Sequence, residues 1–181
     1  MTQIPPSDII AFWREAGPKK WFGGGPAFDA LIQDRFGETH LAAARGDLAD
    51  WENTAEGALA LLLLVDQFPR NLYRHSAHAF ATDEMARSIA GRALARDFDA
   101  QTSADLRAFF YLPFEHHENA ASQAQAVALF EKLGDKMGLE YAQLHADLIA
   151  RFGRFPHRNA VMGRISTPDE IASLAQGGFA G

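Results

Sequence analysis

The sequence contains no cysteine. This excludes a disulfide framework, a cysteine-ligated zinc site, an iron–sulfur cluster and a thiol nucleophile. It also has no surplus of positive charge, because 17 Lys and Arg residues stand against 23 Asp and Glu residues and give a net charge of −6. Nucleic-acid-binding proteins usually carry a basic field, so this balance argues against a nucleic-acid partner.

A long apolar run is also missing. The longest uncharged apolar stretch, Gly57 to Val65, is about half of the roughly 20 residues that a membrane-spanning helix needs. We interpret it as a helix that is buried on all sides. The segment from Met1 to Asp8 has neither the basic start nor the apolar stretch of an export signal. We therefore expect a cytoplasmic protein with no membrane partner.

Sustained alternation of apolar and polar residues, the pattern of a half-buried strand, is absent as well. Apolar residues recur instead at helical spacing, between residues that start and stop helices. The sequence therefore predicts an all-α fold of about eight helices in antiparallel helix–turn–helix pairs, similar to an α-solenoid. The length of 181 residues suits a single domain over residues 1–181.

Helix boundaries follow from caps, prolines and glycines. Thr167-Pro168-Asp169-Glu170 combines an N-cap threonine, a proline at the first helical position and a glutamate that completes a capping box. Pro69 is expected to end the apolar helix, and Pro113 to kink or end another. One predicted helix begins at Ser7. The other seven run over 26–45, from Asn53 or Thr54 to Pro69, from Thr82 to Asp97, from Ser103 to Pro113, over 120–137 and 140–152, and from Thr167 to Gly177.

Polar residues at the end of the apolar helix form the first segment that packing alone does not explain. Asp66 falls one turn after Leu62, so its side chain is expected to face the interior. A buried carboxylate must be paired or neutralised, and Arg70, four residues on, is one candidate partner. Asn71 follows directly.

The second such segment, Glu115 to Asn119, follows the aromatic run 109–114. Neighbouring side chains on a helix diverge by about 100°, so all five cannot meet at one point. Two or three can, for example Glu115 with Glu118, or His116 with Asn119.

The third segment is rich in arginine and runs from Arg151 to Asn159, with Arg164 beyond it. Pro156 is expected to begin a short helix, which places His157 and Arg158 in the first turn. Cations are unfavourable at that end of the helix dipole. The pattern therefore predicts a negative partner, either an acidic side chain elsewhere in the fold or a bound anion.

These segments resemble the bacterial family catalogued as domain of unknown function 924, and the resemblance covers nearly the whole chain. It implies a tetratricopeptide-like all-helical fold and no established reaction. The sequence departs from the family pattern at His117 and Asn119, where Ser and Asp are usual. The matching motifs are Trp21-Phe22, Trp51, 64–71, 79–83, 114–116, and the stretch from His145 through 151–159 to 163–167.

Ten polar residues make up the candidate site: Asp66, Arg70, Asn71, His116, Glu118, His145, Arg154, His157, Arg158 and Asn159. The plainest interpretation is an internal network in which paired arginines and carboxylates join helix ends. On this interpretation the chain is a non-enzymatic binding or interaction protein, and we expect no cofactor and no metal.

Three functional alternatives stay open. A concave helical face could bind a peptide or a partner protein. The second and third segments together could serve metal-assisted or acid–base hydrolysis through His116, Glu118 and His157, although no His-Glu-x-x-His motif is present. A small anionic ligand, a carboxylate or a phosphate compound, could also be bound. Its cationic contacts would be Arg70, Arg154, Arg158 and His157, with apolar walls from Trp51, Phe109 and Phe155.

Overall fold

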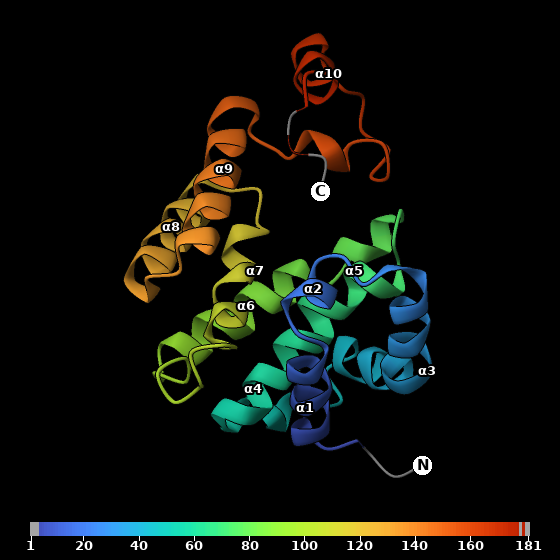
Figure 1. Cartoon of the computed structure of the whole chain (residues 1–181), viewed down its shortest axis with the longest axis vertical. Helices are drawn as coiled ribbons and strands as arrows, with labels where there is room; N and C mark the ends of the chain where they lie inside the picture. Colours follow the sequence, from blue (N-terminus) through green and yellow to red (C-terminus); the bar gives the residue numbers. More distant parts are fainter. Residues whose placement is uncertain (1–3, 178, 180–181) are drawn as a thin grey trace. The chain divides into compact units, whose positions relative to one another are not determined.

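The computed structural model describes residues 4–177 and 179, and these residues form helices and no strand (Figure 1). The all-α prediction is thus confirmed. None of the described helices combines the length and the apolar character needed to cross a bilayer. The α-helices are α1 (Pro6–Ala16), α2 (Pro18–Trp21), α3 (Gly25–Ala44), α4 (Ala55–Leu62), α5 (Phe68–Leu72), α6 (Asp83–Leu94), α7 (Leu112–Glu115), α8 (Ala120–Leu133), α9 (Lys136–Phe152) and α10 (Pro168–Ala175).

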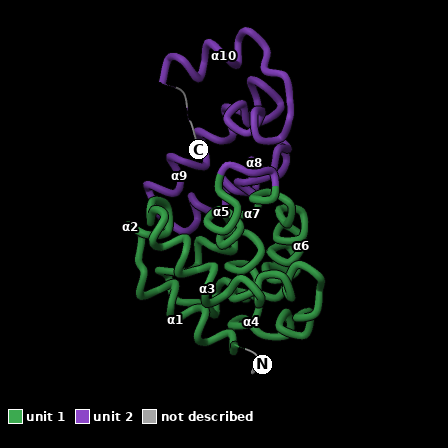
Figure 2. The backbone as a smooth tube through the Cα atoms, turned by 90° about the vertical axis from the view of Figure 1, so that its right-hand side faces the viewer, with its two compact units in different colours: residues 1–74, 78–113 green, residues 75–77, 114–181 purple. Residues whose placement is uncertain are grey.

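Five short helical turns of the 3₁₀ or π type also occur among the described residues. Four are 3₁₀ turns: η1 (Ala49–Asn53), η3 (Ala77–Phe80), η4 (Arg107–Phe110) and η5 (Pro156–Arg158). The fifth, η2 (Leu63–Gln67), is a π-helical turn. The chain divides into two compact units (Figure 2): residues 1–74 with 78–113, and residues 75–77 with 114–181. The prediction of one domain over residues 1–181 stays a prediction.

The first unit is built around α4, against which α1, η1 and α6 pack. Every side chain from Leu62 to Val65 is fully buried, which confirms the interpretation of this run as a helix buried on all sides. Trp13 and Phe109 lie in the same core, with ring centroids 5.8 Å apart. This unit holds all three tryptophans of the chain.

The expectation that Pro69 ends the apolar helix is wrong. The chain stays helical through η2 and α5 as far as Leu72. In η2 the Phe68 N–H donates to the carbonyl of Leu63, five residues back, instead of to that of Leu64. Pro69 has no N–H to offer to the carbonyl of Val65. Two buried carbonyls therefore lose the donors that an α-helix would supply.

Side chains of α3 and of the residue before α6 satisfy both carbonyls. The imidazole Nδ1–H of His40, on α3, donates to the Leu64 carbonyl over 2.8 Å. The hydroxyl of Thr82 donates to the Val65 carbonyl over 2.5 Å. Thr82 precedes α6, as predicted, but its hydroxyl is used here and makes no cap hydrogen bond. These two bonds let the helix pass through Pro69 with its backbone groups paired.

The helix predicted from Ser103 to Pro113 is also wrong, since the segment forms η4 and then α7. The Ser103 hydroxyl accepts a hydrogen bond from Arg14 over 2.9 Å and is not used as an N-cap. Pro113 lies in the first turn of α7, where the missing N–H of a proline costs nothing.

The second unit begins with the helical hairpin α8–α9, whose helices lie side by side (Figure 1). Gly134 adopts a left-handed conformation, with φ of 76°, and ends α8. Asp135 then caps α9 by accepting the N–H of Gly138 over 3.1 Å. The predicted boundary between these helices, at 137–140, is therefore a few residues late. Leu148 and Phe155 belong to the apolar core of this unit.

The satisfaction of the Val65 carbonyl gives a first prediction. Thr82→Val keeps the shape of the side chain but strands a buried carbonyl, so it should lower the free energy of unfolding by about 1–3 kcal/mol. Urea denaturation followed by tryptophan fluorescence measures this, because Trp13, Trp21 and Trp51 all belong to the first unit.

Pro69→Ala provides the control, because alanine restores an N–H next to the same carbonyl. Thr82→Val should cost less in the Pro69→Ala background than in the natural sequence. Equal costs in the two backgrounds would contradict the assignment.

Candidate functional site

The ten candidate residues are divided between the two units. Asp66, Arg70 and Asn71 lie in the first unit. The other seven, His116, Glu118, His145, Arg154, His157, Arg158 and Asn159, lie in the second. The anion site expected from Arg70 together with Arg154 and Arg158 thus draws on both units, and each group is described within its own unit.

In the first unit, Asp66 is buried, with 1% of its surface exposed, and accepts a hydrogen bond from Gln67 over 2.5 Å. The expected partner Arg70 lies 3.9 Å from its carboxylate. Arg70 makes its shorter bonds elsewhere, to Asp83 over 2.8 Å and to the carbonyl of Ala79. The guanidinium therefore ties α5 to the start of α6.

Asn71 serves a second tie, between α5 and α3. Its amide donates to Asp29 over 2.7 Å, and Arg74 binds the same carboxylate through two bonds of 2.8 Å. Burial alone would raise the pKa of Asp29, but the bonds from Arg74 and Asn71 lower it below its usual value. The carboxylate is thus charged and fully engaged.

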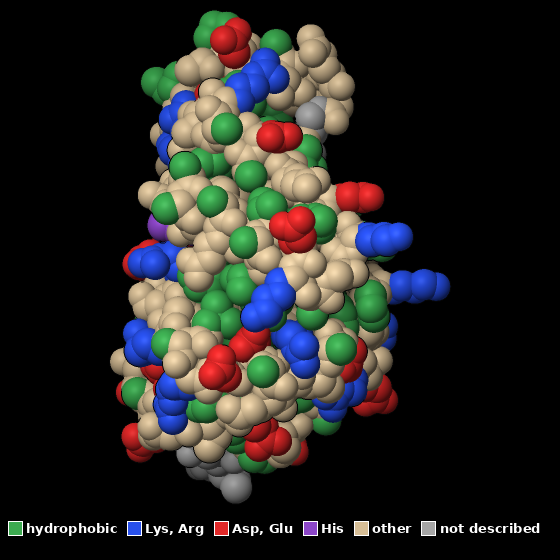
Figure 3. Space-filling view, turned by 90° about the vertical axis from the view of Figure 1, so that its left-hand side faces the viewer, with side chains coloured by type: hydrophobic (Ala, Val, Ile, Leu, Met, Phe, Trp, Pro, Cys, Tyr) green, Lys and Arg blue, Asp and Glu red, His purple; other side chains and the backbone are tan. Residues whose placement is uncertain are grey.

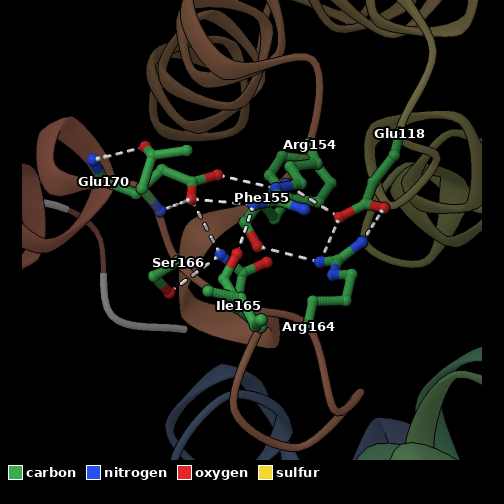
Figure 4. A network of polar contacts seen from close by, with 9 residues as sticks. Glu118, Arg154, Phe155, Arg164, Ile165, Ser166 and Glu170 are labelled. Atoms are coloured by element: carbon green, nitrogen blue, oxygen red, sulfur yellow. Dashed lines mark hydrogen bonds and ion pairs between the residues drawn. The ribbon is translucent and has the colours of Figure 1, made fainter.

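In the second unit, Glu118 forms what we call the Glu118 clamp, with Arg164 and the backbone of Phe155 (Figure 4). Its carboxylate accepts two bonds from the Arg164 guanidinium, over 2.6 and 2.9 Å, and one from the Phe155 N–H, over 2.7 Å. Burial would raise the pKa of Glu118, but these bonds together lower it. The clamp joins the turn before α8 to the segment after α9.

Glu170 forms a second clamp (Figure 4). It accepts two bonds from Arg154, over 2.7 and 2.9 Å, together with the Thr167 N–H and the amide of Asn159. Bonding to Arg154 is the largest of several effects that lower the pKa of Glu170 to about 2. Glu170 also completes the capping box of α10 with Thr167, as predicted. One carboxylate thus serves a helix start and an ion pair.

Aromatic and imidazole rings fill the space beside the Glu118 clamp. The ring of His157 stacks on Phe155, with centroids 5.6 Å apart, and His145 meets Phe155 edge-on at 5.1 Å. Burial is the largest of the effects that lower the pKa of both histidines to about 4. Both are therefore neutral at pH 7. The Nδ1–H of His145 donates to the carbonyl of Tyr141 over 2.8 Å, and Glu115 lies 3.2 Å from the same nitrogen.

The sequence predicts a negative partner for the cations that follow Pro156. Arg158 is buried, and its guanidinium lies over the ring of Phe155, 4.6 Å from its centroid. Its charge contributes to the lowered pKa of Glu118. An acidic side chain of the fold therefore stands near these cations. Pro156 begins the 3₁₀ turn η5, as expected.

The expected convergence of His116 with Asn119 stays a prediction. The Asn119 side chain caps α8 by accepting the N–H groups of Ala121 and Ser122, over 2.9 and 3.3 Å. His116 lies half-buried in the turn before it. Glu115 contacts His145, whereas Glu118 binds Arg164, so the two carboxylates meet different partners.

A groove of about 380 Å³ opens in the second unit, next to the Glu170 clamp. One side comes from the end of α9 and the residues after it, the other from the start of α10. Arg151 lies on this surface with its guanidinium over the ring of Phe152, 4.6 Å from the centroid. The lining residues are Arg151, Phe152, Arg154, Thr167, Asp169 and Glu170.

Several important residues are missing from the predicted set. Glu170 was expected only as a helix cap, and Arg164 only as a cation beyond the third segment. Asp83 and Asp29 gave no signal, because each meets its arginine across a long stretch of chain. Within the described residues, no group of three or more His, Asp or Glu side chains is arranged to hold a metal ion.

Fold and site together define an all-helical protein whose second unit is closed by two carboxylate–arginine clamps. The chain belongs to the bacterial DUF924 family of proteins of unknown function, whose sequence profile matches residues 9–178. It is similar to a solved structure of a protein of unknown function from Agrobacterium tumefaciens. The two share 48% identity and a TM-score of 0.92, over 94% of this chain and 97% of the other. No curated protein matches the chain.

The Glu118 clamp gives a second prediction. Glu118→Ala should lower the free energy of unfolding by about 2–3 kcal/mol, because it removes the acceptor for Arg164 and for the Phe155 N–H. Urea denaturation followed by far-UV circular dichroism measures the loss in helices that hold no tryptophan. Glu131→Ala, an exposed glutamate of α8, is the matched control and should change stability by less than about 0.5 kcal/mol. Similar losses in the two variants would contradict the clamp.

The Glu170 clamp predicts a pH dependence. The folded pKa of about 2 lies below the ordinary value near 4.5, so the unfolded chain binds the extra proton in between. The stabilisation is complete above about pH 5 and is lost as the pH falls toward 2. It should amount to about 1–2 kcal/mol, because the side chain of Arg154 is 28% exposed and screened by solvent. Glu170→Gln should flatten this part of the stability curve, and Glu131→Gln should leave it unchanged.

Proposed function

We propose that this chain is a non-enzymatic interaction protein, and that the groove between the end of α9 and the start of α10 binds an acidic segment of a partner protein. The observation that carries the proposal is the state of Arg151. Its guanidinium lies in the groove on the face of Phe152, and no acidic group of the described residues pairs with it. Its neighbour Arg154 is fully engaged by Glu170. Arg151 is thus a cation presented to a partner.

The charges of the groove favour a peptide over a small multiply charged anion. Two arginines and two acidic residues line it, so its formal charge is balanced. A phosphate compound at Arg151 would also meet Asp169. An extended peptide can place a carboxylate at Arg151 and a basic side chain at Asp169, and so match both charges.

A purely apolar docking surface has less support. Exposed apolar side chains on α9, such as Met137, Tyr141 and Leu144, are a narrow row along one helix. On the face shown in Figure 3, hydrophobic side chains are scattered among charged ones. Scattered apolar side chains are ordinary on a protein surface, whereas a large contiguous patch marks an interface.

The hydrolytic alternative at His116, Glu118 and His157 also has less support. Both oxygens of Glu118 accept hydrogen bonds from Arg164, and one accepts the Phe155 N–H as well. A carboxylate engaged in this way, with a lowered pKa, is a poor general base. The contact between Glu115 and His145 does not orient a catalytic imidazole, because the Nδ1–H of His145 donates to the Tyr141 carbonyl over 2.8 Å.

We also infer that the protein works in the bacterial cytoplasm, which the bacterial description of the family and the absence of cysteine support. The pairing of α8 with α9 is compatible with a tetratricopeptide-like arrangement.

Titration with two short peptides tests the proposal. In ¹H–¹⁵N NMR spectra, acetyl-Gly-Glu-Gly-Lys-Gly-amide should shift the amide signals of 151–154 and 167–170. Arg151→Ala should weaken its binding by about two- to fivefold, the range of an exposed ion pair. Arg45→Ala, which removes an exposed arginine of the first unit, should leave the dissociation constant unchanged.

The peptide in which Gln replaces Glu separates charge from general adhesion. This Gln peptide should bind the natural protein more weakly than the Glu peptide does. The two peptides should bind Arg151→Ala equally well. Equal binding of the two peptides to the natural protein, or shifts confined to other surfaces, would contradict the proposal.

A further inference from the structure

The ring of Phe179, in the second unit, packs among aromatic side chains. Phe179 belongs to no helix, and its ring meets the edge or face of His145, His157 and Tyr141. The ring centroids lie 4.7, 5.2 and 6.4 Å away, at interplanar angles of 64–81°. Phe179 also packs against the core cluster of Leu148, Ile149 and Phe155. We call the surface formed by Tyr141, His145, Phe155 and His157 the aromatic socket.

The socket contains an unused polar atom. Nδ1 of His157 is buried and has no hydrogen-bond partner among the described residues. The Phe179 ring, 5.2 Å from the imidazole centroid, has no polar group with which to satisfy it. A buried polar atom without a partner costs free energy, and native proteins rarely leave one without a reason. The Phe179 ring therefore makes the ring contacts of the socket but leaves this nitrogen without a partner.

We propose that the aromatic socket is a binding site for an aromatic ring that carries a hydroxyl group, and that Phe179 fills this site until such a ligand displaces it. The proposal does not depend on the groove at Arg151, because it uses different side chains and a different kind of ligand.

The chemistry of the socket selects a phenol over other aromatic ligands. A hydroxyl can both donate and accept, so it suits either tautomer of a neutral His157. A cationic aromatic ligand is disfavoured, because Arg158 and Arg164 lie close enough to influence His157. The edge-on geometry at His145 and His157 suits any neutral aromatic ring. A phenol can thus repeat the contacts of Phe179 and add one hydrogen bond.

Displacement of Phe179 needs little rearrangement. The side chain is only half-buried, and its contacts are with the rings of the socket and with the core cluster of Leu148, Ile149 and Phe155. The socket itself is built from α9, η5 and Phe155 between them, and the Glu118 clamp holds the Phe155 backbone through bonds that do not involve Phe179. The phenol could be a free small molecule or a tyrosine side chain of a partner protein, since both present the same group.

Binding of p-cresol, the tyrosine side-chain analogue, tests the proposal against toluene, which has the same ring without the hydroxyl. By NMR titration, p-cresol should bind the natural protein and move the Phe179 ring signals toward those of an exposed phenylalanine. It should bind about three- to tenfold more tightly than toluene, as one additional hydrogen bond provides. Phe179→Ala should strengthen binding of both ligands. Phe22→Ala, which truncates an exposed phenylalanine of the first unit, should not.

His157→Phe keeps a ring in the same place and removes Nδ1. It should abolish the preference for p-cresol over toluene while leaving toluene binding. The pentapeptide acetyl-Gly-Gly-Tyr-Gly-Gly-amide separates the two sources of the phenol. Competition between it and p-cresol for the same signals supports a tyrosine side chain, and binding of p-cresol alone supports a free small molecule.

Three results would overturn the proposal. The first is binding to Phe179→Ala only, with no displacement of Phe179 in the natural protein, which would show nothing more than a cavity left by truncation. The second is equal affinity for p-cresol and toluene. The third is a preference for p-cresol that survives in His157→Phe. Circular dichroism of each variant confirms that a lost signal reflects binding and not unfolding.

Discussion

The carboxylate of Glu170 is the interaction on which the end of the second unit depends. It gathers bonds from Arg154, from the amide of Asn159 and from the Thr167 N–H, which come from three different stretches of chain. Between Gly153 and Pro168 the only helical element is the short turn η5, so few backbone bonds hold this part in place. Glu118 does the same for Arg164 and Phe155. Acidic side chains here take over the role that a helix backbone plays elsewhere.

In the first unit the backbone and the side chains exchange these roles. There the backbone supplies the acceptors, at Leu64 and Val65, and the side chains of His40 and Thr82 supply the donors. Leu64 and Val65 are fully buried. A carbonyl left without a donor at either residue would therefore lower the free energy of unfolding. Both units therefore rest on single side chains that complete a backbone, and the loss of any of them should cost far more than an exposed substitution.

How far the sequence reveals this depends on distance along the chain. Local signals worked: the capping box at Thr167 and Glu170, the helix start after Thr82, and the pair of Asp66 with Arg70 all involve neighbours within four residues. The pairs Glu118 with Arg164 and Arg154 with Glu170 span 46 and 16 residues, and nothing in the local pattern selects one carboxylate for one arginine. Pro69 misled for the same reason, because the donor that replaces its missing N–H comes from Thr82.

The wide turn at Leu63–Gln67 has a consequence for the phase of the helix that contains it. A π turn adds one residue to the normal repeat, which rotates all later side chains by about 100° about the axis. That rotation sets the directions in which Arg70 and Asn71 face their acidic partners on α6 and α3. Deleting one residue here would remove the extra residue of the wide turn and rotate both side chains away from those partners. The extra residue therefore sets the direction of the side chains of α5. A natural relative that lacks it would need different ion pairs and hydrogen bonds at this position.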